Sequence, residues 1–140
     1  MTNPPGMPPA VDVIVVNFNA GEALLRCIRS VLEQDLPVRL TLVDNASTDG
    51  SDDIAARHDR FRLVRNDHNG GFVANNLALR DLDGVDYVGL VNADSFVEPG
   101  WLGPLVDALQ DDPGLGAASA CSIRRRRSSC SSGMATAYGF

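Results

Sequence analysis

Three apolar segments of strand length, each followed by a cluster of Asn, Asp and Ser, constrain the fold of this chain more than any other feature. The segments are 11–16, 39–43 and 87–91, and helical apolar patterns lie between them. Nearly continuous apolarity over five or six residues is typical of strands buried on both faces of a parallel sheet. Strands that alternate with helices therefore predict an α/β fold, a Rossmann-like, mostly parallel sheet with flanking helices.

The segments between these strands carry the helix signals. The spacing of Leu24, Ile28 and Val31 places apolar side chains on one helix face, and Ser51 is a good first residue for a short helix with Asp52 and Asp53 in its first turn. The predicted helices are Glu22–Gln34, a short helix from Ser51, Phe72–Arg80 and Pro99–Leu109, and further strands are predicted at 61–64 and 117–120.

Composition divides the chain into three parts. Residues 1–10 contain four prolines and are expected to be a flexible leader, and residues 11–122 form the predicted domain. In residues 123–140 four arginines follow Ile123, and serine, cysteine and glycine come next, which predicts a disordered tail. The abrupt change suggests a shifted reading frame or a truncated gene, and a basic nucleic-acid-binding tail is the alternative.

The charged residues exclude several functions. The chain contains no lysine, which excludes a Walker P-loop and a Schiff-base enzyme. Without the block Arg124–Arg127, 18 acidic residues face 12 − 4 = 8 arginines, so the domain is a poor general binder of nucleic acid. The three cysteines predict neither a disulfide framework nor a zinc site. No transmembrane segment or signal peptide is recognisable, so a cytoplasmic location is expected.

The polar clusters after the three strands are candidates for one ligand site. They are Asn17–Asn19, Asp44–Ser47 and Asn92–Ser95. In a parallel sheet the carboxyl ends of the strands share one edge, and ligands bind in the crevice beyond it. Carboxylates and amides suit ribose hydroxyls, a base edge and a hard divalent cation, either Mg²⁺ or Mn²⁺.

These segments resemble the family 2 glycosyltransferases of GT-A fold. The resemblance rests on Val13–Asn19, Leu42–Ser51, Val91–Ser95, and Asn69–Phe72 with the following Asn75 and Asn76, in the family's order and approximate spacing. It covers about residues 11 to 120 and is strongest to the rhamnosyltransferase-like branch. It implies the N-terminal, nucleotide-binding half of a GT-A fold, which takes a nucleoside-diphosphate sugar as donor.

The resemblance also implies roles for five residues. Asp44 would accept a hydrogen bond from the nucleobase, and Asn17 and Asn19 would line the nucleotide pocket. Asn92 would face the ribose, in place of the first acid of the family's D-x-D motif. Asp94 would hold the metal ion on the diphosphate.

Structural alternatives remain open at several of these positions. Asp44 and Asp94 are also suited to initiating or capping turns. Asn75 and Asn76 lie one residue earlier than the family's usual spacing, and one residue rotates a helix face by about 100°. Trp101 is expected to pack a helix onto the sheet.

The family's parent reaction is sugar transfer to a hydroxyl acceptor, a saccharide or a lipid-linked saccharide, with inversion. The half that carries the acceptor site and the catalytic base is not recognisable here, so no catalytic residue is assigned. A truncated remnant that binds nucleotide without transfer is therefore the alternative, and the inner face of the membrane is the alternative location. A receiver-like signalling domain is disfavoured because such domains use a lysine at this edge.

Overall fold

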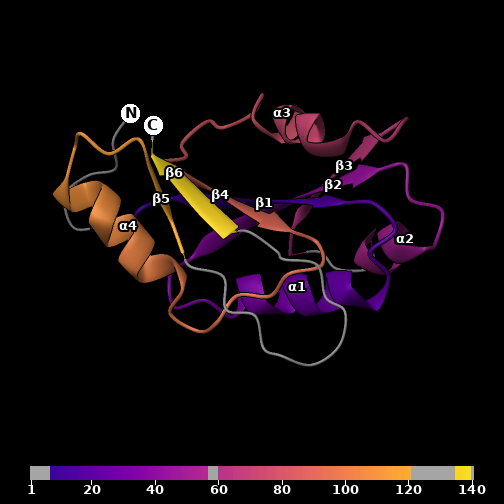
Figure 1. Ribbon diagram of the computed structural model, residues 1–140, viewed down its shortest axis with the longest axis horizontal. Helices are drawn as coiled ribbons and strands as arrows, with labels where there is room; N and C mark the ends of the chain where they lie inside the picture. Colours follow the sequence, from indigo (N-terminus) through magenta and orange to yellow (C-terminus); the bar gives the residue numbers. More distant parts are fainter. Residues whose placement is uncertain (1–6, 57–59, 121–134, 140) are drawn as a thin grey trace.

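The computed structural model describes residues 7–56, 60–120 and 135–139, which build a sheet covered by helices on both faces (Figure 1). The sheet has six strands in the order β3-β2-β1-β4-β6-β5. The strands are β1 Val11–Asn17, β2 Val38–Asn45, β3 Arg62–Asn66, β4 Tyr87–Asn92, β5 Ala117–Ser119 and β6 Ala135–Gly139. The helices are α1 Glu22–Leu32, α2 Ser51–Ala56, the 3₁₀ turn η1 Gly71–Ala74, α3 Asn75–Ala78 and α4 Leu102–Asp111.

The first four strands of the sheet order run parallel. β1 lies between β2 and β4 and pairs with both, and β3 adds to the outer edge of β2. β6 runs antiparallel to both β4 and β5. The predicted α/β architecture with a mostly parallel sheet is therefore confirmed.

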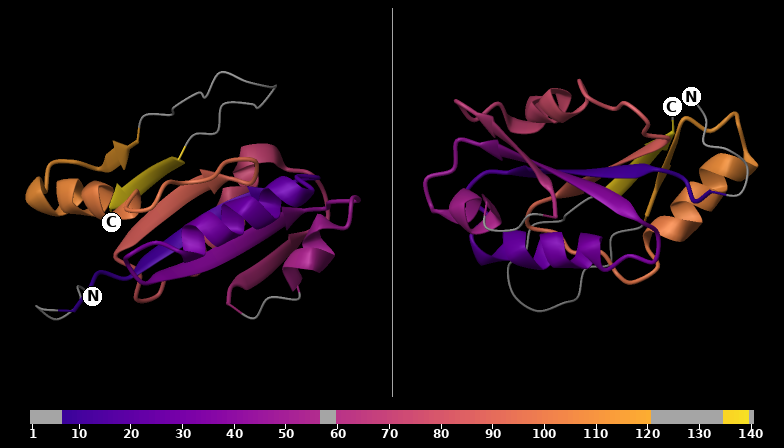
Figure 2. Two further views of the ribbon diagram at one scale, coloured as in Figure 1. Left: turned by 90° about the horizontal axis from the view of Figure 1, so that it is seen from below. Right: turned by 180° about the vertical axis from the view of Figure 1, so that it is seen from behind.

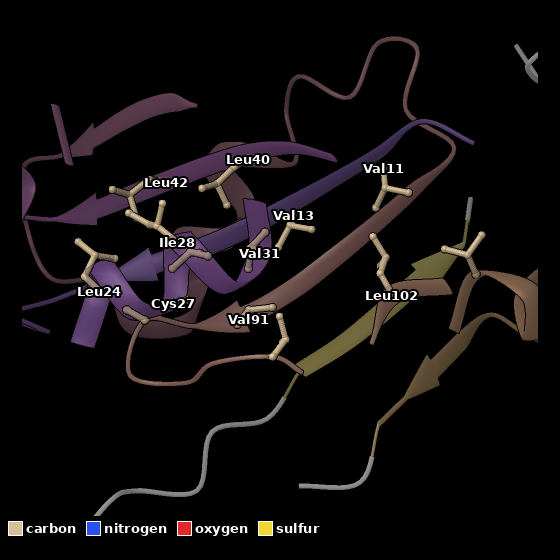
Figure 3. Close-up of a cluster of buried hydrophobic side chains, with 14 residues drawn as sticks. Val11, Val13, Leu24, Cys27, Ile28, Val31, Leu40, Leu42, Val91 and Leu102 are labelled. Carbon is tan, nitrogen blue, oxygen red and sulfur yellow. The ribbon is translucent and has the colours of Figure 1, made fainter. Parts of the chain in front are cut away.

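Side chains of β1 alternate between two apolar layers, as the period of a strand requires. Val13 and Val15 belong to the larger cluster with α1, where Cys27 and Ile28 are buried (Figure 3). Ile14 faces the other way and packs in a smaller cluster with η1 and α3. Figures 1 and 2 show α1 and α3 on opposite faces of the sheet.

The helix α4 extends the larger layer. Leu102 and Val106 join the cluster with α1, and Leu105 and Leu109 pack near Trp101. Trp101 packs both against the cluster with α1 and against Leu105 and Leu109 of α4, so the expectation that it packs a helix onto the sheet is confirmed.

Three predicted helices have different bounds in the structure. α1 ends two residues early at Leu32, and α4 begins at Leu102, three residues after Pro99. The helix predicted over 72–80 is replaced by η1 followed by the single turn α3. Gly71 at φ 58°, together with a 3₁₀ start, leaves too few residues before the next loop for a longer α-helix.

The predicted disordered tail requires one correction. Residues 135–139 form β6, which pairs with β4 over five positions from Tyr87 to Val91. The strand contains Thr136 and Tyr138, which favour β structure, and β4 offers a free edge of backbone donors and acceptors. Residues 121–134, including the arginine block, lie outside the described residues. None of the described helices is long and apolar enough to cross a bilayer.

Candidate functional site

An open cavity of about 370 Å³ lies at the carboxyl edge of the parallel strands. Residues at or just after the ends of β1, β2 and β4 line it, together with Asn69 and the first residues of η1. The lining residues are Val16, Phe18, Asn19, Ala20, Asn45, Asn69, Gly71, Phe72, Asn92, Ala93 and Asp94. The ends of three strands therefore converge on one cavity, as expected from the parallel sheet.

Three of the five predicted site residues line this cavity: Asn19, Asn92 and Asp94. Asn19 has a left-handed φ of 51°, which Asn tolerates better than most residues. Its Oδ1 accepts a hydrogen bond from the Thr48 N–H at 2.7 Å, and its own N–H donates to Ser47 Oγ at 3.1 Å. These two bonds join the loop after β1 to the loop after β2.

Asn17 and Asp44 do not line the cavity. Both are buried, and Asn17 Nδ2 donates to Asp44 Oδ1 at 2.8 Å and to Ser51 Oγ at 2.8 Å. The other oxygen of Asp44 accepts from the Ser47 N–H at 3.1 Å, so the carboxylate also closes a turn. In this structure the two residues hold the strand ends together, and a nucleobase contact by Asp44 stays a prediction.

Asp49 adds a further link between the same two loops. Its carboxylate accepts from the Ser51 hydroxyl at 2.6 Å and from the Gly21 N–H at 2.9 Å. The side-chain bond from Ser51, followed by its backbone bond, lowers the pKa of Asp49 below its usual value. The loops after β1 and β2 are therefore one hydrogen-bonded unit.

Sequence reasoning missed Asn45 and the two aromatic residues of the cavity, Phe18 and Phe72. Asn45 belongs to the face of β2 that carries Val43 and α3, whereas Asp44 points to the opposite face. Its amide is bonded to Asn69 Oδ1 and to the Gly71 carbonyl. Strand alternation, counted from the apolar residues, is the signal that distinguishes the two neighbours.

Cys27 lies close to the predicted metal-binding segment. Its thiol donates to the Asn92 carbonyl at 3.4 Å. Burial, and to a lesser extent the negative charge of Asp94, raises the pKa of the Cys27 thiol to about 12. Cys27 is therefore a neutral thiol at physiological pH.

The donor set decides how a metal ion fits this cavity. Among the described residues, no three His, Cys, Asp or Glu side chains gather in a group that could hold an ion. Asp94 brings one carboxylate to the cavity and Asn92 one amide. Mg²⁺ and related ions are bound through one or two carboxylates plus substrate phosphates. The residues present fit an ion that arrives with a diphosphate.

The family model "Glycosyl transferase family 2" matches residues 12–135, which is most of the chain and includes all three strand ends. The chain belongs to glycosyl transferase family 2. It is 27% identical to glycosyltransferase GlyG of Streptococcus pneumoniae over 107 residues, covering 72% of this chain and 35% of that protein. It is 29% identical to the succinoglycan biosynthesis protein ExoU of Rhizobium meliloti over 103 residues, covering 71% and 30%. The chain thus spans about a third of the length of these relatives.

Solved structures support the GT-A fold of this family member. The mannosyltransferase PcManGT from Pyrobaculum calidifontis, in complex with GDP-Man and Mn²⁺, has a TM-score of 0.75 and 30% identity, covering 85% of this chain and 37% of that chain. TarS 1–349 of S. aureus in complex with UDP has a TM-score of 0.64 and 22% identity, covering 73% and 32%. The predicted family is confirmed, whereas none of these matches tests the rhamnosyltransferase-like branch.

Proposed function

We propose that the cavity at the carboxyl edge binds a nucleoside-diphosphate sugar together with Mg²⁺ or Mn²⁺ held by Asp94. The observation that carries this proposal is the convergence of Asn19, Asn92 and Asp94 on one cavity in a member of this family. The complex of PcManGT with GDP-Man and Mn²⁺ supports it from a related fold.

The cavity offers distinct surfaces for the parts of such a ligand. Phe18 and Phe72, which are 47% and 76% exposed, are aromatic rings suited to cover the flat faces of a base. Asn19 and Asn92 supply amides that match ribose hydroxyls. The buried pair Asn17–Asp44 keeps the first two loops in place beneath these contacts.

A bound divalent ion would neutralise charge that grows on the departing nucleoside diphosphate. Asp94 would hold that ion from the turn after β4. The remaining lining residues bind and orient the donor, and none of the described residues is assigned the proton transfer that activates an acceptor.

The proposal extends to the reaction in which the bound donor takes part. We infer sugar transfer to a hydroxyl acceptor, a saccharide or a lipid-linked saccharide, by a protein that works in the cytoplasm or at the inner membrane face. The rhamnosyltransferase-like branch rests on the sequence motifs alone. Donor binding without transfer is the second candidate, because the cavity residues with a proposed role, Asn19, Asn92 and Asp94, all act on the donor.

Calorimetric titration with UDP, dTDP and GDP, each with Mn²⁺ and with EDTA, tests the proposal. We expect one of the three to bind tightly only with metal, and Asp94→Asn to weaken that binding by about tenfold or more, since a charged ligand is lost. An assay for hydrolysis and transfer of the matching nucleotide sugar separates an enzyme from a binding remnant.

Asp83→Asn is the matched control, because Asp83 is exposed in the loop before β4, at the opposite edge of the sheet. It should bind like the unmodified chain. Absence of nucleotide binding under all conditions, with the chain shown to be folded, would overturn the proposal. If nucleotide binds with equal affinity in Mn²⁺ and in EDTA, the proposal keeps the nucleotide site but loses the metal ion.

A further inference from the structure

One face of α1 is bonded to the loop that carries Asp94. We call Cys27 and Ser30 of α1, together with Gln34 two residues past its end at Leu32, the α1 polar stripe. Residues 93–101, between β4 and α4, are the β4–α4 loop. Cys27 and Ser30 are three positions apart and are therefore neighbours on the helix surface. Gln34 follows just after the last turn, and its Nε2 donates to the Ser30 carbonyl at 3.0 Å. The partners of the stripe outside α1 begin at the last residue of β4 and end at the first residue of α4.

Gln34 holds the end of the β4–α4 loop through both halves of its amide. Its Nε2 donates to the Glu98 carbonyl at 3.1 Å, and its Oε1 accepts from the Leu102 N–H at 3.3 Å. If the amide were reversed, its NH₂ group would face the Leu102 N–H, and its oxygen would face the Glu98 carbonyl. The contacts therefore require this orientation and this side chain length.

Ser30 holds the middle of the loop. Its hydroxyl donates to the Cys27 carbonyl within α1 at 2.8 Å, and this fixes its oxygen as an acceptor. The Val97 N–H donates to that oxygen at 3.1 Å. Both functions of the hydroxyl are used, and the buried Val97 side chain joins the α1 cluster.

Cys27 holds the turn that contains Asp94. The Asn92 carbonyl accepts from the Cys27 thiol at 3.4 Å and from the Ser95 N–H at 3.0 Å. The second bond closes a four-residue turn with Asp94 at its third position. The stripe thus reaches the residue on which the proposed metal site depends.

We propose that the α1 polar stripe positions Asp94 for the metal–diphosphate by fixing the conformation of the β4–α4 loop. Cys27, Ser30 and Gln34 do not line the cavity and act through the loop, so they are positioning residues. The positioning role rests on the proposed function, whereas the hydrogen bonds to the loop are present in the structure whatever the site binds. The Arg26 guanidinium adds a further contact from α1, over the Phe96 ring at 5.0 Å.

Amide hydrogen exchange tests the contacts without any ligand. Ser30→Ala removes the acceptor of Val97 and Gln34→Leu removes the acceptor of Leu102, so exchange at the matching amide should become about tenfold faster. Alanine favours the helix, so α1 should persist in Ser30→Ala. Ser30→Thr keeps the hydroxyl and should restore slow exchange, and Glu33→Ala, at an exposed position of the same helix end, is the control.

Nucleotide titration with Mn²⁺ and with EDTA tests the positioning role. In Ser30→Ala and Gln34→Leu we expect the gain in affinity due to Mn²⁺ to shrink roughly 3- to 10-fold, the loss expected for one hydrogen bond. Binding in EDTA should stay unchanged. A merely structural role would weaken both measurements together, and Ser30→Thr should match the unmodified chain.

Three results would overturn this inference in distinguishable ways. Unchanged exchange at Val97 and Leu102 in the variants would show that the stripe does not hold the loop. Faster exchange with an undiminished Mn²⁺ effect would show that the loop is held but that Asp94 does not depend on it. Absence of any Mn²⁺ effect in the unmodified chain would remove the metal from the proposed function and would refute the positioning role, while the exchange rates still report on the loop.

Discussion

Asp12 is a carboxylate in the apolar part of β1, which otherwise has only the terminal Asn17 as a polar residue. Its neighbours explain how it is accommodated. It is fully buried and accepts hydrogen bonds from Arg39 Nε and Nη2 at 2.9 and 2.8 Å. Thr41 Oγ1 lies 3.0 Å from its other oxygen. Burial of a charge is costly unless it is paired and hydrogen-bonded, and here β2 supplies both partners.

The pair Asp12–Arg39 should respond asymmetrically to mutation. Arg39→Ala leaves a buried carboxylate with a single Thr41 donor, and we expect it to lower the free energy of unfolding by about 3 kcal/mol. Asp12→Asn leaves the guanidinium, whose side chain is 40% exposed, and should cost about 1–2 kcal/mol. Urea unfolding of both variants decides the order, and an equal or reversed cost would contradict it.

Cys27 predicts a loss of stability at alkaline pH. Its pKa rises from 9.0 to about 12 on folding, so the unfolded chain releases the thiol proton first and folding is disfavoured as pH increases above 9. Between pH 8 and 10.5 this one group should lower the free energy of unfolding by about 2 kcal/mol. Comparison with Cys27→Ala in EDTA isolates its share, and parallel pH profiles would refute the shift.

At the scale of the elements, apolar pattern was enough to predict β1, β2, β4 and the position of α1. These segments bury side chains on a regular period, and the period is written directly in the sequence. In place of the predicted helix Phe72–Arg80, α3 is a single turn, because Gly71 and a 3₁₀ turn precede it. Such local backbone geometry leaves no periodic signal in the sequence.

The site could be predicted at the level of loops, and only partly at the level of side chains. Asn19, Asn92 and Asp94 line the cavity, whereas the adjacent polar residues Asn17 and Asp44 are buried in a pair. All five occur in similar polar clusters, and composition cannot tell which side chain faces solvent. That depends on the face of each strand that the helices cover.

Gly89 lies where β4 passes under Trp101 and beside Val13 of β1. A Cβ atom added there would be 3.3 Å from Val13 Cγ2 and 3.6 Å from Trp101 Cη2. Gly89→Val should therefore lower the free energy of unfolding by about 2 kcal/mol, because a packed layer resists added methyl groups. Gly116→Val is the control, since a Cβ atom added there meets no atom within 4 Å outside its two chain neighbours. Equal midpoints of thermal unfolding for the two variants would contradict close packing at Gly89.

At the scale of the whole molecule, β6 determines how the sheet ends. Without it, β4 would present its backbone donors and acceptors to solvent along five positions, and β5 would lose the strand with which it pairs. Such an edge can pair with another chain. The sequence of β6 has too few apolar residues to indicate a strand by pattern alone. Only its pairing with β4 and β5 distinguishes this segment from a loop.

Ala137→Pro tests whether β6 belongs to the folded sheet. Ala137 pairs with Gly89 of β4 and with Ala118 of β5, and proline there removes a donor from the centre of the ladder. We expect a loss of about 1–3 kcal/mol in the free energy of unfolding, the cost of an unsatisfied backbone group. Hydrogen exchange in β4 should become faster, because the edge opens. Ala137→Ser keeps the N–H and should leave both unchanged. If the proline variant is as stable as the serine variant, β6 contributes nothing to the sheet and the domain ends at β5.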